Sequence, residues 1–270
     1  MLCSTEPYSP EILAKCRARV ISRAGVGFDS VDLQAATANN IVVTRTPGVL
    51  HESAAEQTLA FIFAIYRNVI SRDRLIREGK WDRVCWPRLQ GLTLGLMGLG
   101  VIGRSVAAMA LGLGLKVIAH DPAAAPQEGV NLVTLDQLWT QSDILSLHTP
   151  CTSQTANIIN RSTLQRMKPG SVLINTSRGG LVDEQALAEA LISGHLRGAA
   201  LDVFQEEPPR RTNPLLKLDN VVLAPHMAGM DLESEREMAS MAARNIIDLH
   251  EGRWPSANVV NPEVRPTWKW

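Results

Sequence analysis

Short apolar runs rich in β-branched residues alternate along the chain with amphipathic stretches. The first series predicts two strands, at residues 19–22 and 41–44, around a helix at 32–38. The second series predicts six strands, at residues 93–97, 116–119, 144–147, 172–175, 199–203 and 221–223. Such alternation is typical of parallel sheets with crossover helices, so the chain is predicted to be an α/β protein.

Helices are predicted between and after these strands, at residues 104–111, 135–141, 184–193 and 233–250. A long apolar helix precedes the second series. Ser53 is its predicted N-cap, because Glu56 follows at the spacing of a capping box. Residues 71–80 predict a polar, solvated helix, and residues 81–87 a connecting loop. The last helix is expected to return to the first series, because a small βαβ unit needs packing partners.

The charges of the chain balance, with 27 basic and 27 acidic residues. This balance argues against nucleic-acid and membrane partners, whereas a small anionic substrate needs only one or two local cations. The longest apolar run, at residues 59–66, is far too short to cross a bilayer, and the N-terminus lacks a signal pattern.

The four cysteines, Cys3, Cys16, Cys85 and Cys151, are scattered and form no CxxC pair. Their spacing predicts neither a metal site nor a disulfide framework. We therefore interpret them as free thiols in a reducing compartment, and expect a cytoplasmic location.

A glycine-rich motif joins the strand at 93–97 to the next helix. Gly98 suits a tight turn, Gly100 a close approach to a pyrophosphate, and Gly103 close packing of helix on strand. The helix N-terminus offers free N–H groups to phosphates. Asp121 ends the next strand, where a carboxylate binds ribose hydroxyls and repels a 2′-phosphate, so NAD is predicted over NADP.

Seven ordered motifs carry a resemblance to a known family. They are RAGVGFD at 23–29, SAAE at 53–56, the glycine motif, HTP at 148–150, NTSRGG at 175–180, LDVFQEEP at 201–208 and PHMAG at 225–229. From about Pro10 to Trp254 the chain resembles the D-isomer-specific 2-hydroxyacid dehydrogenases, and especially their phosphoglycerate dehydrogenase branch. The resemblance implies hydride transfer between NAD and a short D-2-hydroxy acid: phosphoglycerate first, then hydroxypyruvate or glyoxylate.

Pattern and resemblance together predict two α/β domains. Residues 51–231 are expected to form a doubly wound Rossmann domain that binds NAD. Residues 1–50, completed by residues 232–270, are expected to form a smaller, flavodoxin-like substrate domain.

The resemblance implies three catalytic residues. Arg178 matches the arginine that binds the substrate carboxylate and polarises the keto group. A guanidinium suits this role because it can bind a carboxylate through two parallel hydrogen bonds. His226 matches the acid–base histidine and Glu207 its carboxylate partner, which favours the protonated ring that donates to the alkoxide. Taken by themselves, the three also fit a surface or capping arginine, a loop histidine and a solvated glutamate.

The resemblance also assigns binding residues. The expected cofactor contacts are Gly98, Gly100, Val101, Ile102, Gly103, Asp121, Thr149, Thr176, Ser177, Arg178, Asp202, His226 and Gly229. The expected substrate contacts are Arg23, Val26, Gly27 and Arg178. The glycine turn at 25–27 could also serve only as a tight turn, Arg23 as a strand-end charge, and Asp202 as a turn former. His148 is interpreted as structural.

Two features depart from the family pattern. Relatives usually carry a further βα repeat before residues 19–22, so the substrate domain is expected to be incomplete, with about two strands and open apolar faces. The chain is interpreted as a truncated sequence or a degenerate paralogue that lacks one wall of its substrate pocket. In addition, Leu50 stands where many relatives have asparagine.

The resemblance implies a homodimer formed through the nucleotide-binding domains, with the apolar helix at 53–66 in the interface. Two alternatives to an active enzyme stay open. An NAD(H)-sensing regulator or corepressor on the same fold would keep these motifs, and a truncated paralogue could bind NAD with little activity.

Overall fold

The computed structural model describes residues 2–3 and 7–270. Contacts divide the chain into a small unit, residues 1–50 with 230–270, and a large unit, residues 51–229.

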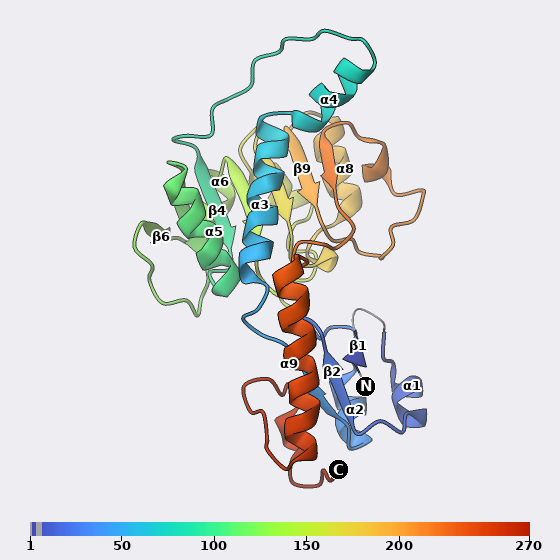
Figure 1. Ribbon diagram of the computed structural model, residues 1–270. Helices are drawn as coiled ribbons and strands as arrows, with labels where there is room; N and C mark the ends of the chain where they lie inside the picture. The colour runs from blue at the N-terminus through green and yellow to red at the C-terminus, as the bar shows by residue number, and fades with distance from the viewer. Residues whose placement is uncertain (1, 4–6) are drawn as a thin grey trace. The chain divides into compact units, whose positions relative to one another are not determined.

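The large unit is built on a seven-stranded, wholly parallel sheet (Figure 1). In spatial order its strands are β10 (Val221–Leu223), β9 (Gly198–Leu201), β8 (Val172–Asn175), β7 (Ile144–Leu147), β4 (Thr93–Met97), β5 (Lys116–His120) and β6 (Val130–Leu132). The chain reverses its direction across the sheet between β4 and β7, which is where doubly wound sheets bind ligands. The sequence predicted six of these strands and missed β6, a short edge strand in which only Val130 is buried.

Helices cover both faces of this sheet. One face is covered by α3 (His51–Tyr66) and α5 (Val101–Gly112), the other by α6 (Leu135–Gln141), α7 (Arg161–Arg166) and α8 (Glu184–Ile192). Within β8, Leu173 packs toward α6–α8 and Ile174 toward α3 and α5, and both are fully buried. A strand that is apolar on both sides is the pattern expected of a covered parallel sheet.

One prediction about α3 needs correction. The helix begins at His51, so Ser53 is a buried residue of its first turn and not its N-cap. Its apolar residues, including Phe61 and Ile62, pack against α5 and the sheet, which leaves Phe63 as its one large exposed apolar side chain. Most of the apolar surface of α3 is therefore covered by its own unit, and a part for its exposed face in a dimer interface stays a prediction.

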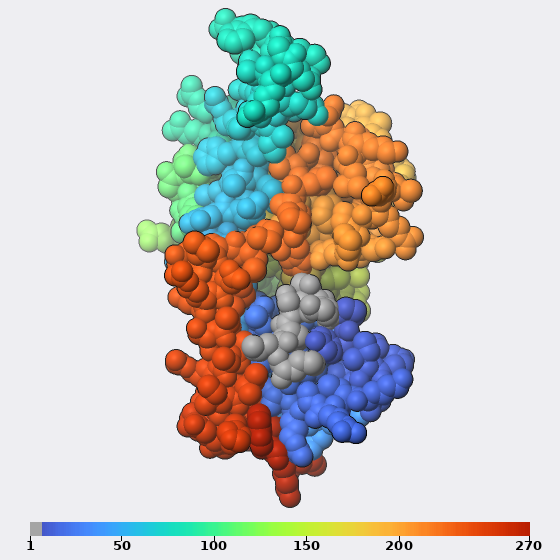
Figure 2. Space-filling view, turned by 45° about the vertical axis from the view of Figure 1, so that its right-hand side comes forward, coloured from blue at the N-terminus to red at the C-terminus, as the bar shows by residue number. Residues whose placement is uncertain are grey.

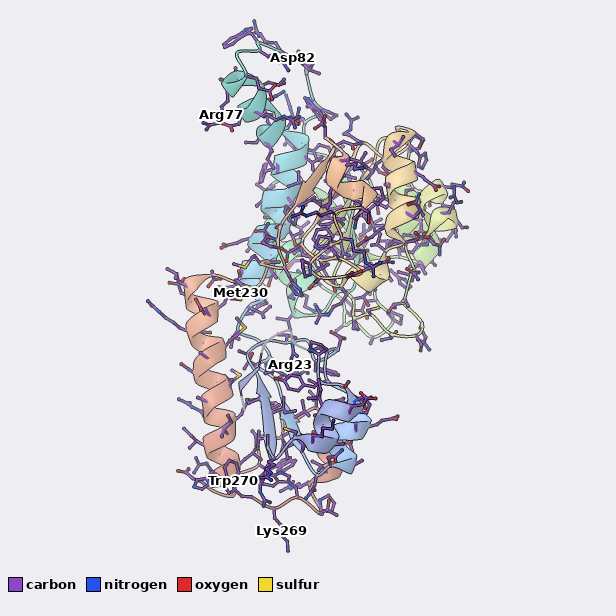
Figure 3. All side chains as sticks on the ribbon, turned by 90° about the vertical axis from the view of Figure 1, so that its right-hand side faces the viewer. Arg23, Arg77, Asp82, Met230, Lys269 and Trp270 are labelled. Atoms are coloured by element: carbon purple, nitrogen blue, oxygen red, sulfur yellow. The ribbon has the colours of Figure 1, made fainter. Side chains whose placement is uncertain are left out.

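After α3 the chain leaves the body of the large unit. Helix α4 (Val69–Arg77) has no buried residue, and a long irregular loop returns from it to β4 (Figures 1 and 2). Arg77 and Asp82 mark this segment in Figure 3. We call residues 67–88 the arm.

The small unit has a three-stranded parallel sheet in the order β1 (Leu2–Cys3), β2 (Val20–Arg23), β3 (Val42–Thr44). Helices α1 (Pro10–Lys15) and α2 (Leu33–Ala38) cover one face, and α9 (Leu232–His250) with the C-terminal segment covers the other.

Successive residues of β2 divide between these two layers. Ile21 packs toward α1 and α2, Val20 toward α9, and both are buried. The expectation of about two strands with open apolar faces is therefore wrong. A third strand is present, and α9 and the segment after it bury the second face.

The cysteines Cys16, Cys85 and Cys151 are free thiols, and the side chain of Cys3 lies outside the described residues. Across residues 7–270, no cluster of His, Cys, Asp and Glu side chains could hold a metal ion. No helix in the same range is both long enough and apolar enough to span a bilayer.

Candidate active site

The glycine motif after β4 is fixed by close backbone contacts. Gly98 has a φ of +100°, and a Cβ there would lie 2.5 Å from the carbonyl oxygen of His148. A Cβ on Gly103 would overlap the carbonyl oxygen of Gly98. Both positions exclude a side chain because β4, β7 and α5 approach one another closely.

The next turn offers free donors. Gly100 is the N-cap of α5 and supplies no side-chain cap, so the first N–H groups of the helix, from Val101 onward, are open to a ligand. A Cβ on Gly100 would meet nothing in the protein, and packing therefore does not explain the glycine. Open space before an uncapped helix N-terminus fits the pyrophosphate of a dinucleotide.

Asp121 lies beside this turn, at the end of β5. One of its carboxylate oxygens accepts the N–H of Leu99 at 2.8 Å, and the other accepts the N–H of Ala123 at 2.9 Å. These bonds fix the carboxylate, and each oxygen keeps a lone pair for a ribose hydroxyl.

Hydroxyl groups gather at the ends of β7 and β8. Ser177 donates to the carbonyl of Thr149 at 2.6 Å, so its hydroxyl can only accept from a ligand. Thr176 lies 3.0 Å from the hydroxyl of Thr58 on α3, and Thr58 donates its own proton to Ala54. Thr176 is therefore the donor in this pair.

Arg178 follows in a loop shaped by Asn175. The amide of Asn175 donates to the carbonyl of Arg178 at 2.8 Å and accepts the N–H of Ser177 at 3.0 Å. A Cβ on Gly179 would overlap the backbone of Phe204, so this loop lies directly against the segment that carries Glu207.

Glu207 and His226 form the pair that the resemblance implied. The Nδ1 atom of His226 lies 2.7 Å from a carboxylate oxygen of Glu207, and both side chains are about one third exposed. The bond to Glu207 leaves Nε2 as the nitrogen that can exchange a proton with a substrate.

Charges around Glu207 keep it ionised. Partial burial by itself would raise its pKa. The hydrogen bonds from His226 and from the Phe204 N–H, together with the charges of His226 and Arg178, outweigh burial and lower the pKa below its ordinary value. Arg178 and His226 thus both act electrostatically on Glu207.

Asp202 anchors the turn that presents His226. Its carboxylate is fully buried at the end of β9 and accepts the N–H groups of Met227 at 2.8 Å and Ala228 at 2.7 Å. Its carbonyl accepts the N–H of His226 at 2.7 Å. His226 has a φ of +55°, a left-handed conformation that these three bonds hold in place. Gly229 follows this turn.

The expected substrate residues Arg23, Val26 and Gly27 belong to the small unit. Arg23 is buried and donates to the hydroxyl of Ser30. The side chain of Thr46 accepts the N–H of Gly25 at 2.9 Å, so Val26 and Gly27 remain as the candidate backbone donors of this turn. Their role in substrate binding remains a prediction.

His148 lies under the glycine loop, where its Nε2 atom is 2.8 Å from the hydroxyl of Ser146. Burial lowers the pKa of His148 to about 4, so the ring is neutral near pH 7. This arrangement agrees with the structural role expected of it.

Sequence reasoning assigned no role to Thr58 or Asn175. Asn175 had a usable signal, because an asparagine at a strand end often binds the backbone two residues later. Thr58 had none, because it lies 118 residues from the hydroxyl that it contacts.

Comparisons with known proteins agree with this geometry. Residues 59–228 match the family model described as the NAD binding domain of D-isomer specific 2-hydroxyacid dehydrogenases. The chain is 42% identical to a glyoxylate reductase of Korarchaeum cryptofilum, over 96% of this chain and 81% of that one. It is 41% identical to a D-3-phosphoglycerate dehydrogenase of Archaeoglobus fulgidus, over 92% of this chain and 48% of that one.

Similarity also extends to solved structures. The D-lactate dehydrogenase of Aquifex aeolicus, complexed with NAD and lactic acid, superimposes with a TM-score of 0.88 at 30% identity. The match covers 96% of this chain and 86% of that one.

The glycine contacts predict a selective effect on cofactor binding. Replacing Gly103 with Ala should weaken NADH binding by about tenfold or more, because the new methyl group separates α5 from the glycine loop. Gly112→Ala, in the same helix but with open space around it, is the matched control and should bind NADH normally. Fluorescence titration measures both, and equal affinities would contradict the assignment.

The lowered pKa of His148 predicts a pH-dependent stability. The unfolded chain takes up the histidine proton below about pH 6.5, but the folded protein does so only near pH 4. The free energy of unfolding should therefore fall as the pH drops between these values. His148→Gln should remove on the order of 1–2 kcal/mol of that fall, measured by urea unfolding at pH 7.5 and 4.5. A His195→Gln control should retain it, and an unchanged fall in His148→Gln would contradict the argument.

Proposed function

The chain belongs to the family of D-isomer specific 2-hydroxyacid dehydrogenases, and from this premise we propose that Arg178, Glu207 and His226 catalyse the interconversion of a short 2-keto acid and its D-2-hydroxy acid. The enzyme is an NAD-dependent oxidoreductase. The observation that carries the residue assignment is the meeting of a guanidinium, a carboxylate and an imidazole at the carboxyl ends of β8, β9 and β10.

Arg178 binds the carboxylate of the substrate in this proposal and draws electron density from the keto oxygen. A guanidinium serves both purposes because it offers several donors in one plane and keeps its charge. The hydrogen bonds between the Asn175 side chain and the backbone of Ser177 and Arg178 hold this loop in place, and they support the role proposed for Arg178.

His226 supplies the proton for reduction and removes it in oxidation. As the keto carbon is reduced, its oxygen becomes an alkoxide, and protonated Nε2 donates to it. Glu207 stabilises the resulting positive ring through Nδ1 and fixes its orientation. In the reverse direction the neutral ring accepts the hydroxyl proton.

The residues after β4 fit the dinucleotide. Gly98 and Gly103 shape the turn, the open N–H groups of α5 receive the pyrophosphate, and Asp121 receives the adenine ribose. We assign Thr149, Thr176, Ser177, Asp202 and Gly229 to the nicotinamide side. When bound, NAD would accept the hydride in oxidation, and NADH would supply it in reduction.

We infer that the substrate is a small, unbranched 2-keto acid such as glyoxylate, hydroxypyruvate or 3-phosphohydroxypyruvate. Similar proteins carry the names glyoxylate reductase, hydroxypyruvate reductase and D-3-phosphoglycerate dehydrogenase. Assays of NADH oxidation with each keto acid distinguish among them. If NADH binds but no member of the panel is reduced, the chain acts as a nucleotide-sensing protein.

The acid–base assignment predicts two kinetic signatures. His226→Ala should lower turnover by about a hundredfold or more while NADH affinity stays close to that of the wild type. Glu207→Gln should move the pH profile of reduction to lower pH, because without the negative charge the ring loses its proton sooner. Steady-state kinetics between pH 5 and 10 measure both.

Glu206→Gln is the matched control, because Glu206 pairs with Arg210 in solvent beside the site. It should leave rate and profile unchanged. If Glu207→Gln behaves like Glu206→Gln, Glu207 is not the partner of the catalytic histidine.

We propose that the enzyme is a homodimer and that the arm, residues 67–88, forms the interface. The arm exposes Val69, Ile70, Ile76, Trp81 and Val84, and Trp81 is 81% exposed. Apolar surface of this extent favours burial against another protein. The arm holds seven basic and three acidic residues in a chain whose charge is balanced, so the rest of the chain carries a matching acidic excess. A second copy therefore offers the complementary charge.

A cavity of about 210 Å³ adjoins the arm and extends the proposed interface. It is lined by Ile65, Ile70, Leu218 and Trp86, with the guanidinium of Arg197 5.5 Å from the Trp86 ring. Within residues 7–270 the buried indole N–H of Trp86 has no hydrogen-bond partner.

The arm predicts the oligomeric state. The wild type should have twice the 29.5 kDa chain mass by light scattering. The double variant Ile76→Asp/Val84→Asp should be monomeric at micromolar concentration, because buried charges oppose association. The control Ile192→Asp, on an exposed position of α8, should stay dimeric. A monomeric wild type, or a dimeric double variant, would contradict the proposal.

We also propose a cytoplasmic location. The support is chemical: the three described cysteines are free thiols, which suits a reducing compartment.

A further inference from the structure

Glu207 lies in an irregular loop, residues 205–213, between the end of β9 and the short helix η2 (Pro214–Lys217). Pro208 and Pro209 have no N–H groups with which to brace the loop. The position of Glu207 therefore depends on how the two ends of the loop are held.

A single carboxylate contacts both ends. Glu184 is the first residue of α8, and its Oε1 atom accepts the backbone N–H of Gln205 at 2.8 Å. Its Oε2 atom accepts the side-chain amide of Asn213 at 2.6 Å. Hydrogen bonds to an ionised carboxylate are stronger than bonds between neutral groups.

The bond at Gln205 is directly coupled to Glu207. The N–H of Phe204 donates to Oε1 of Glu207 at 3.1 Å, and the next N–H, that of Gln205, donates to Glu184. Two successive amides are thus held by two different carboxylates. The side chain of Gln205 also donates to the carbonyl of Val182 at 2.7 Å, which ties this end of the loop to the segment that leads into α8.

We propose that Glu184 is a positioning residue for the Glu207–His226 pair. It contacts neither side chain, but it fixes the loop that keeps the Glu207 carboxylate 2.7 Å from Nδ1 of His226. Loosening the loop weakens this contact, so the imidazole loses its proton at lower pH and turnover falls. The proposal rests on the acid–base role proposed for Glu207 and His226.

The test combines Glu184→Gln with Glu207→Gln. In Glu184→Gln one carboxylate oxygen is replaced by an NH₂ group. This NH₂ group then faces another donor, either the backbone N–H of Gln205 or the side-chain amide of Asn213. We expect kcat to fall by about threefold to tenfold, with the pH profile of reduction displaced in the same direction as in Glu207→Gln and NADH affinity unchanged. Glu189→Gln is the matched control, because Glu189 lies in the same helix but pairs with Arg161 and not with the loop at 205–213. It should behave as the wild type.

In a chain that already carries Glu207→Gln, adding Glu184→Gln should change kcat by less than about twofold, because the group to be positioned is gone. Asn213→Ser supplies a second variant: serine can still cap η2 but is too short to reach Glu184, and it should displace the pH profile in the same direction.

The outcomes separate this inference from the function on which it rests. If Glu207→Gln moves the profile but Glu184→Gln and Asn213→Ser do not, Glu184 has no positioning role. The same conclusion follows if Glu184→Gln lowers kcat equally with and without Glu207. If Glu207→Gln itself leaves the profile unchanged, the acid–base assignment fails first.

Discussion

The buried carboxylate of Asp202 holds the turn that carries His226, the proposed acid–base residue. It accepts the N–H groups of Met227 and Ala228, and its main chain accepts that of His226. A buried carboxylate without partners costs several kcal/mol, so the turn is strongly bound to the end of β9. The left-handed conformation of His226 follows from this arrangement and directs the imidazole toward Glu207. The resemblance implied a place near the nicotinamide for Asp202, and the structure shows that it also holds the turn at His226.

The glycine motif obeys a comparable constraint from the other half of the sheet. Gly98 and Gly103 lack side chains because β4, β7 and α5 meet there, whereas Gly100 faces open space. Packing explains why Gly98 and Gly103 are glycines, whereas the open space at Gly100 leaves room for a bound ligand. Parallel strands bring all their carboxyl ends to one edge, so this turn and the turn at His226 lie at the same edge of one sheet although about 120 residues separate them in the chain.

Much of the fold could be predicted from the sequence, because buried parallel strands are short, mostly apolar runs. Strands β4, β7, β8 and β10 begin and end at the predicted residues. The edge strand β6 was missed, because with one buried residue it has no such run. The N-cap assigned to Ser53 failed because burial in the first turn prevailed over a local capping pattern. In the site, motifs indicated Arg178, Glu207 and His226, and the resemblance implied the Glu207–His226 pair. The bonds of Asn175, Asp202 and Glu184 that hold the surrounding loops could not be predicted. The contacts of Glu184 span 21 and 29 residues and connect the first residue of α8 to both ends of an irregular loop, which has no periodicity from which to predict them.

We infer that this chain moves a hydride from NADH to the keto carbon of a short 2-keto acid and yields the D-isomer. The most direct test is the reduction of hydroxypyruvate with NADH deuterated at both C4 hydrogens, followed by mass spectrometry and chiral separation of the product. We expect glycerate of D configuration with one deuterium on C2. L-glycerate, or D-glycerate without deuterium on C2, would contradict it.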